Sequence, residues 1–322
     1  MNNSELKSKW EDIATSSEKK GFKALRITAT CIPDLFIALD TEGFRCLIFF
    51  LPAGLDVDTR GLDKNKLHLS YIPSKSVLFI KLKDSEFFDL FDDLILSIYS
   101  KINSISNPKK ASHEFIATFY KWSYFFEDTL KKKLGEEQVQ GLFGELFVLR
   151  EFVEQCDPLK INSVLSSWKG PYDAPNDFIL DNKNLEVKTK REALPSVKIS
   201  SEFQLEPEHS KGLELVVLSV KLDLTIGQSI HNLLSQLVQK IREKAGDLTI
   251  LFQALTQKGL TIDSLRDYNN HRFIVSNKCT YDCTVKGFPR LSTSNIPKEV
   301  SDLRYTLKIK SLNDFLIEEK KY

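Results

Sequence analysis

The chain has 322 residues, of which 42% are hydrophobic and 28% are charged. These values are typical of a water-soluble globular protein, and the length leaves room for two compact domains. The formal net charge is +1, which argues against a generally basic protein that coats nucleic acid, so any surface for a polyanion has to be a local patch.

The cysteines and the apolar segments bear on where the protein works. The five cysteines are odd in number and widely scattered, which indicates a reduced compartment. The first residues are polar, and no apolar run approaches the roughly 20 residues that span a bilayer. We therefore expect a soluble, cytoplasmic protein without a membrane partner.

The first third of the chain predicts a β-rich domain over residues 1–105. A short amphipathic helix is expected over residues 5–20, and one long amphipathic helix over residues 87–102. Between them lie segments that are typical of an antiparallel sheet, at residues 22–31, 35–39, 44–51, 67–71 and 76–83. This domain would recognise a target or dock a partner, and its sequence does not choose between the two.

Residues 103–110 contain Ser, Asn and Pro, and they are the best candidate for a linker. A second domain is expected over residues 111–322. It would begin with an aromatic-rich helix over residues 112–133, which ends in the cationic run 131–133. Its later elements are expected as strands at 213–222, 272–276, 281–288 and 304–309, and as helices at 228–244, 248–258 and 312–318.

The most informative segment is a predicted β-hairpin between Asp177 and Thr189. Two short runs with alternating apolar residues flank the turn-rich stretch 181–184. The expected register pairs Leu180 with Leu185, Ile179 with Glu186, and Asp177 with Lys188. Because successive side chains in a strand alternate in direction, three charged side chains would share one face: Asp177, Glu186 and Lys188.

In this register Asp177 and Glu186 are diagonal neighbours whose carboxylates can converge. Two converging carboxylates can share a hard cation such as Mg²⁺, while Lys188 faces the same space. This geometry predicts a metal-dependent phosphodiesterase. The alternative is a solvated ladder of charges, which is common on exposed sheet faces.

The helix expected around residues 141–149 carries one charged side chain, Glu145, among apolar neighbours. A buried carboxylate is costly unless a cation or a hydrogen-bond donor compensates it, so Glu145 is either part of a metal site or a paired core residue. Gly141 and Gly144 are unfavourable inside a helix, and we expect both to allow close approach to the sheet.

These residues resemble the PD-(D/E)XK nuclease superfamily, which includes restriction endonucleases and recombination and repair nucleases. The segment Glu186-Val187-Lys188-Thr189 is similar to the E-V-K-T form of its motif, with Asp177 upstream. Residues 141–149 resemble the first core helix, and residues 197–205 resemble the next strand and helix start, where a glutamine often approaches the site. The resemblance covers roughly residues 134–222 and favours restriction-associated members. Asn176 stands where the motif has proline.

The resemblance implies an α/β (α+β) fold in which a restriction-endonuclease-like core follows the N-terminal β-rich domain. It implies Mg²⁺ as cofactor, with Mn²⁺ as a substitute, held by Asp177, Glu186 and the main-chain carbonyl of Val187. Lys188 would orient or deprotonate the attacking water, and Glu145 would complete the metal site. Gln204 would hold a phosphate, the water or Lys188, and Ser200 or Ser201 would cap the helix that carries it.

Other residues near these motifs have weaker functional interpretations. Lys190, Arg191 and Lys198 add positive charge that suits phosphates but is equally normal on a solvated surface. Trp168 and Tyr172 are able to contact a base or a sugar, although aromatic packing is the commoner use. Cys279 and Cys283, with His271, form at most half of a zinc site. No phosphate-binding loop, nucleophile elbow or dinucleotide-binding turn is present.

The sequence therefore predicts a Mg²⁺-dependent DNA endonuclease that acts in restriction or in defence against foreign DNA. A methyltransferase or an ATPase of a restriction system would be a partner, and homodimerisation stays open. One alternative is a catalytically silent nuclease-fold subunit that binds DNA or a partner protein. Another is a nuclease that cleaves RNA, because the metal site does not distinguish the two substrates.

Overall fold

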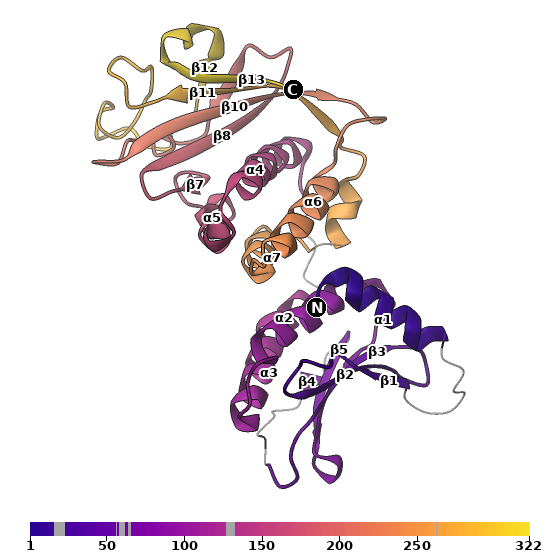
Figure 1. Ribbon diagram of the computed structural model, residues 1–322. Coiled ribbons are helices and arrows are strands. Elements are labelled where there is room, and N and C mark those ends of the chain that lie inside the picture. Colours follow the sequence, from indigo (N-terminus) through magenta and orange to yellow (C-terminus); the bar gives the residue numbers. More distant parts are fainter. Residues whose placement is uncertain (16–22, 56, 58–61, 64–65, 127–132, 262) are drawn as a thin grey trace. The chain divides into compact units, whose positions relative to one another are not determined.

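The computed structural model describes residues 1–15, 23–55, 57, 62–63, 66–126, 133–261 and 263–322 (Figure 1). The chain divides into two compact units, Met1–Asp128 and Thr129–Tyr322. Within the described residues, no helix is both long enough and apolar enough to cross a membrane. The fold is mixed α/β, which confirms the predicted fold class.

The first unit contains a six-stranded sheet in which all neighbouring strands are antiparallel. Its order is β1-β2-β3-β6-β5-β4, with bounds β1 (Lys23–Arg26), β2 (Asp34–Leu39), β3 (Arg45–Phe50), β4 (Leu62–Asp63), β5 (Leu67–Ile72) and β6 (Val77–Leu82). The helices of this unit are α1 (Asn3–Thr15), α2 (Phe88–Ile102) and α3 (Pro108–Ser123). The predicted sheet and its long closing helix are confirmed; β1 is shorter than expected and β4 was missed.

Residues 103–110 connect two helices within the first unit instead of separating the units. Helix α3 begins at Pro108, earlier than expected, because the side chain of Asn107 accepts a hydrogen bond from the Lys110 N–H. Proline is well tolerated at this first helical position. After α3 the chain forms a 3₁₀ turn at Tyr124–Phe126, and residues 131 and 132 of the expected cationic run lie outside the described residues.

The second unit is built on a five-stranded sheet with the order β13-β11-β10-β8-β7. Its strands are β7 (Phe178–Ile179), β8 (Lys183–Arg191), β10 (Gly212–Leu222), β11 (Phe273–Asp282) and β13 (Leu316–Lys321). Strands β8 and β10 are parallel, and the other pairs are antiparallel. One face is covered by helices (Figure 1): α4 (Glu136–Gln155), α5 (Ile161–Ser167), α6 (Ile230–Glu243) and α7 (Leu248–Gln257).

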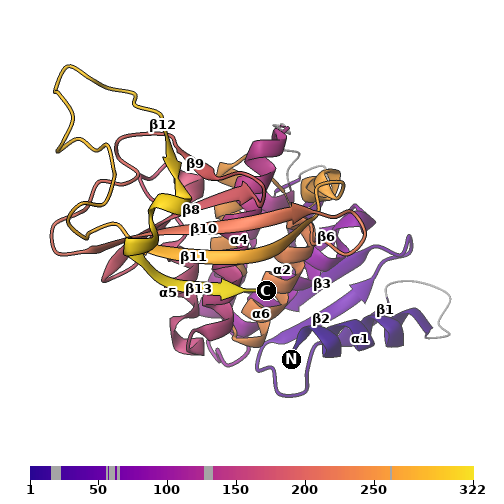
Figure 2. The same cartoon turned by 90° about the horizontal axis from the view of Figure 1, so that it is seen from above.

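The opposite face of this sheet is partly covered by a two-stranded ribbon of β9 (Ser196–Ile199) and β12 (Tyr305–Lys308) (Figure 2). Apolar side chains of the ribbon pack on one end of β10, and this cluster includes Val197, Ile199, Leu307, Leu213, Leu215 and Val217. The other end of the same face is not part of this apolar cluster. The sheet therefore carries a covered half and a polar half.

Three predictions for the second unit are wrong in detail. Residues 312–318 do not form a helix; a 3₁₀ turn at Asn313–Phe315 leads into strand β13. The two strands expected at 272–276 and 281–288 are one continuous strand, β11, that ends at Asp282. The residues after β9 form turns, so the expected helix start with its Ser200 or Ser201 cap is absent from them.

Strand β13 is held in place by Glu151 of α4, which is 5% exposed. The carboxylate of Glu151 lies 2.7 Å from Lys278 Nζ and 3.0 Å from Lys320 Nζ, and it accepts a hydrogen bond from Tyr322. These hydrogen bonds outweigh the effect of burial and lower the pKa of Glu151. Such long-range pairing of a terminal segment has no local signature, which explains why the pattern at 312–318 was misleading.

Close packing of α4 on β8 depends on Gly144. A Cβ atom at Gly144 would lie 1.8 Å from Thr189 Oγ1 and 3.1 Å from a methyl carbon of Leu218. The same atom at Gly141 would meet nothing within 4 Å. The expected close approach is thus confirmed for Gly144 and wrong for Gly141.

This difference predicts opposite outcomes for two alanine substitutions on one helix. Gly144→Ala should destabilise the protein by about 1–3 kcal/mol, because the methyl group overpacks the helix–sheet contact. Gly141→Ala should stabilise it by about 0.5–1 kcal/mol, since alanine has the better helix propensity and open space is available. Urea denaturation measures both, and equal effects of the two substitutions would contradict the packing role of Gly144.

Candidate active site

The hairpin of β7 and β8 forms as predicted, but its register differs by two residues. Phe178 pairs with Leu185 and Ile179 with Asn184, and the Leu180 N–H donates to the Lys183 carbonyl across a tight turn. A shift of two residues keeps every side chain on its expected face. Continuing this register places Asp177 directly opposite Glu186 instead of diagonal to it.

Strand β7 is short, so the edge of β8 beyond Leu185 has room for a side chain. Asp177 takes that room: its Oδ2 accepts a hydrogen bond of 2.8 Å from the Val187 N–H. The N–H and C=O of one strand residue point to the same side, so the Val187 carbonyl also faces Asp177. The hairpin thereby directs a carboxylate and a main-chain carbonyl toward one space.

Helix α4 and the loop before β7 bring Glu145 to Asp177. The indole Nε1 of Trp168 donates a hydrogen bond of 2.8 Å to Glu145 Oε2. A Cβ atom at Gly170 would lie 2.4 Å from Glu145 Oε2 and 2.8 Å from Asp177 Oδ1, so the two carboxylates converge on this glycine. The main-chain N–H groups of Lys169 and Gly170 both donate to the Asp177 carbonyl, which fixes the loop against the hairpin.

Lys188 is held by two oxygens on the face of Glu186. Its Nζ lies 2.7 Å from Glu186 Oε1 and donates a hydrogen bond of 3.0 Å to Gln204 Oε1. The same oxygen of Gln204 accepts from the Ser200 N–H at 2.8 Å. Of the three contacts considered for Gln204 from the sequence, the structure therefore contains the contact with Lys188.

Asn176 supports this arrangement from the position where the motif has proline. It is 4% exposed, and its Nδ2 donates a hydrogen bond of 2.8 Å to the main-chain carbonyl of Gln204. Proline has no group that could make this bond. The departure from the motif thus provides the hydrogen bond that holds the Gln204 turn.

The pKa values of the three carboxyl groups of the site are raised, which disfavours their ionised forms. Burial, aided by the charge of Asp177, raises the pKa of Glu145 to about 8. Burial and the same neighbouring charge raise the pKa of Glu186 well above its usual range, and burial also raises the pKa of Asp177. Three nearby carboxylates cannot all carry charge at neutral pH without a compensating cation.

Positive charges oppose these shifts only in part. Lys188 lowers the pKa of all three carboxyl groups. Lys258, at the C-terminal cap of α7, lowers the pKa of Glu145 and Asp177, and sequence reasoning missed it. Lys258 is 70 residues from the motif and has no local pattern, so only the packing of α7 could reveal it. Gly170 was missed as well, because its role depends on contacts with two distant carboxylates.

The donor set fits a hard divalent cation. Glu186 is 1% exposed, and its Oε2 is buried without a hydrogen-bond partner in the described part of the chain. Asp177, Glu186 and the Val187 carbonyl offer oxygen ligands of the kind Mg²⁺ uses, because Mg²⁺ is usually held by one or two carboxylates and keeps several waters. Among the described residues, no group of three or more His, Cys, Asp or Glu side chains is placed so that together they could hold a metal ion, so main-chain and water oxygens would have to complete the ligand set.

The other residues singled out in the sequence lie in different environments. Trp168 is 1% exposed, so it packs and donates to Glu145 instead of stacking on a base. Tyr172 is 44% exposed and lies beside Lys169, whose Nζ is 5.6 Å from the ring centroid. Cys283 is fully buried in the apolar cluster of the sheet, and burial raises the pKa of its thiol.

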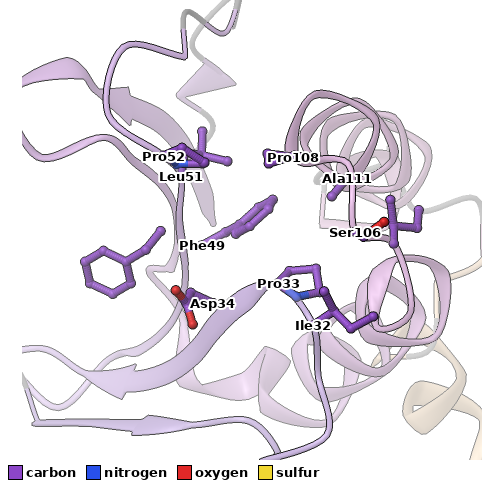
Figure 3. A pocket seen from close by; sticks show the side chains of 11 residues that line it. Ile32, Pro33, Asp34, Phe49, Leu51, Pro52, Ser106, Pro108 and Ala111 are labelled. Atoms are coloured by element: carbon purple, nitrogen blue, oxygen red, sulfur yellow. The ribbon is translucent and has the colours of Figure 1, made fainter.

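The first unit contains an apolar pocket of about 220 Å³ (Figure 3). Its lining includes Pro33, Phe49, Leu51, Pro52, Pro108 and Ala111. Its carboxylate, Asp34, is paired with Arg26. This pocket lacks the paired acids that metal-assisted hydrolysis needs.

The raised pKa of Glu145 predicts that the site lowers the stability of the fold by an amount that depends on pH. An acid whose pKa is raised on folding stabilises the fold fully below its unfolded pKa and loses that contribution as pH rises toward the folded value, here about 8. Glu145→Gln keeps an acceptor for Trp168 and removes the charge. It should therefore stabilise the metal-free protein at pH 8 by on the order of 2 kcal/mol, a value discounted because part of Glu145 contacts solvent.

At pH 5 the stabilisation by Glu145→Gln should largely disappear. Thermal denaturation at both pH values in the presence of a chelator measures the difference. Glu137→Gln, at an exposed residue of the same helix, serves as the control and should shift neither curve. A Glu145→Gln protein that is less stable than the wild type at pH 8 would contradict the electrostatic account.

A family model described as "Putative PD-(D/E)XK family member, (DUF4420)" matches residues 6–310. No match is found among curated proteins or among solved structures. The matched range includes Glu145, Asp177, Glu186, Lys188 and Gln204.

Proposed function

Since the chain belongs to the DUF4420 family of PD-(D/E)XK-like proteins, we propose that it is a metal-dependent nuclease that hydrolyses phosphodiester bonds in DNA. The observation that carries this proposal is that Asp177 accepts a hydrogen bond from the Val187 N–H on β8, between Glu186 and Lys188, which form an ion pair. Glu145 approaches Asp177 from α4, and Gln204 contacts Lys188. The buried, unpartnered Oε2 of Glu186 supports a cation as the missing partner.

Asp177, Glu186 and the Val187 carbonyl would hold Mg²⁺, with Mn²⁺ as a substitute. When bound, the cation would supply Lewis-acid activation of a water and neutralise charge on the scissile phosphate. Glu145, oriented by Trp168, would contact the hydration shell on the side of Gly170. These roles use the oxygens that converge in the site.

Lys188 would act directly on the reacting groups. Its Nζ bridges Glu186 Oε1 and Gln204 Oε1, so two of its three N–H donors already have acceptors. The third donor is available to orient the attacking water or to stabilise charge that develops on the phosphate. Gln204 fixes the direction of this donor, because its own oxygen is anchored by the Ser200 N–H.

The biological role that we propose is restriction or another defence against foreign DNA in the cytoplasm. A methyltransferase or an ATPase of a restriction system would work with the protein, and the first unit would recognise the target or dock that partner. Homodimerisation would allow both strands of a duplex to be cut. These steps rest on analogy with the superfamily, because a fold alone does not determine function.

A catalytically silent DNA-binding or partner-binding subunit is the second candidate. The observation that favours it is the 2.7 Å ion pair between Lys188 and Glu186, which already neutralises one of the acids without a metal. Calorimetric titration with Mg²⁺ or Mn²⁺ distinguishes the two functions. Binding that Asp177→Asn abolishes supports the nuclease, whereas no binding by the wild-type protein supports the silent subunit.

The nuclease proposal predicts the outcome of a cleavage assay. The wild-type protein should cut or nick DNA with Mg²⁺ or Mn²⁺, and a chelator should abolish cleavage. Asp177→Asn, Glu186→Gln and Lys188→Met should each lower the rate at least about 100-fold, as expected when a group that stabilises transition-state charge is removed. Gel electrophoresis of a labelled plasmid measures the rate.

The assay needs a control for general effects of lost charge. Glu243→Gln removes an exposed acid that is paired with Lys240 on α6, so it should cleave like the wild type. An RNA substrate is tested in parallel, because the site itself does not select DNA. Equal residual activity of Asp177→Asn, Lys188→Met and the control would exclude this site as the source of cleavage.

A further inference from the structure

The polar half of the five-stranded sheet adjoins the candidate active site. Thr189 faces α4, since its hydroxyl would collide with a Cβ at Gly144. Side chains alternate along a strand, so Lys188 and Lys190 share the opposite face, the one seen in Figure 2. Lys190 is two residues beyond Lys188 and lies roughly 7 Å from it along the strand.

The residues that pair with Lys190 on the neighbouring strands form a row across the sheet. Lys190 pairs with Ser219, Ser219 with Asn277, and Asn277 with Lys321. We call these four residues the polar row. All four are partly or fully exposed, whereas Val217, in the row that contains Lys188, is buried in the apolar cluster. The polar row therefore begins where the cover of β9 and β12 ends.

The two lysines of the polar row differ from the cations around them. Arg191 pairs with Glu136, Lys198 with Glu137, and Lys320 with Glu151. By contrast, Lys190 Nζ donates at 3.4 Å to the main-chain carbonyl of Glu192, and no carboxylate within 4.0 Å pairs with Lys190 or Lys321 in the part of the chain described. The carboxylate of Glu192 acts on Lys190 only through a longer-range charge interaction, so neither lysine is held in an ion pair among the described residues and both can still contact an anion.

Two polar residues, Asn277 and Ser219, lie between the lysines of the polar row. Asn277 Nδ2 donates to Glu319 Oε1 at 2.8 Å, but Asn277 Oδ1 is buried and lacks a hydrogen-bond partner among the described residues. A buried acceptor without a partner is costly, so the Asn277 amide is a strained polar position within the polar row and not itself a contact for DNA. Ser219, beside it, is a hydroxyl of the kind that contacts phosphates.

We infer that the polar row binds the sugar-phosphate backbone of the DNA strand that enters the active site. This inference rests on the proposed nuclease function and adds the path of the substrate. Three interstrand spacings give the polar row a length of roughly 14 Å, which matches the rise of about four nucleotides of one strand. Contacts of this kind position the strand and do not read its sequence.

The test is the affinity for a short fluorescein-labelled DNA duplex, measured by fluorescence anisotropy with Ca²⁺ in place of Mg²⁺. Lys190→Gln and Lys321→Gln should each weaken binding roughly threefold to tenfold. Each should also reduce the slope of log affinity against log salt by about 0.9, the value for one phosphate contact on duplex DNA. Lys190→Arg should retain the affinity, since it keeps the charge.

Lys240→Gln, on the helical side of the sheet, is the matched control and should leave both affinity and slope unchanged. If the Lys190→Gln/Lys321→Gln double variant binds DNA with the affinity and salt slope of the wild type, the polar row is not the path of the substrate. The nuclease function still stands in that case if the wild-type protein cleaves DNA. Absence of DNA binding by the wild-type protein would overturn both. Circular dichroism of each variant shows whether a loss of affinity reflects a loss of fold.

Discussion

The organisation of the second unit depends on one electrostatic constraint: three largely buried carboxyl groups lie close enough for their charges to act on one another. Glu186 is almost fully buried, and the pKa values of Glu145, Asp177 and Glu186 are all raised. Such a cluster persists only when surrounding structure holds it in place. Much of the local architecture is explained by the groups that compensate these acids.

The groups that compensate these carboxylates come from the main chain, from an aromatic side chain and from a lysine. Asp177 receives a main-chain N–H from Val187, Glu145 receives the indole N–H of Trp168, and Glu186 receives the ammonium group of Lys188. Two glycines make the required distances possible, since Gly144 lets α4 reach β8 and Gly170 leaves space for two carboxylates. One oxygen of Glu186 still lacks a partner among the described residues, and it is the strongest structural argument for a cation.

The sequence predicted the parts of this site that depend on local patterns. The hairpin, the buried acidic helix and the face shared by Glu186 and Lys188 follow from the alternation of side chains and from helical periodicity. The hairpin register was wrong by two residues, because a turn-rich stretch such as 181–184 allows more than one loop length. The error was harmless to the chemistry, since a shift of two residues preserves the faces.

Features that depend on distant contacts were not predictable. Lys258 reaches the site through the packing of α7, and the Gln204 turn replaces an expected helix because hydrogen bonds to Asn176, Ser200 and Lys188 determine its shape. Strand β13 was taken for a helix, because its pairing with β11 and its contacts with Glu151 are set far away in the sequence. Periodicity cannot reveal partners of this kind.

The exposed edge strand of the five-stranded sheet has a consequence for self-association. Strand β13 ends the sheet order, every one of its residues is exposed, and four of the six are charged: Glu318, Glu319, Lys320 and Lys321. Mixed charges on an outer strand discourage the addition of a strand from another molecule. Edge-to-edge aggregation is therefore disfavoured at this strand, and a dimer that brings two of the candidate sites together would have to form through a different surface.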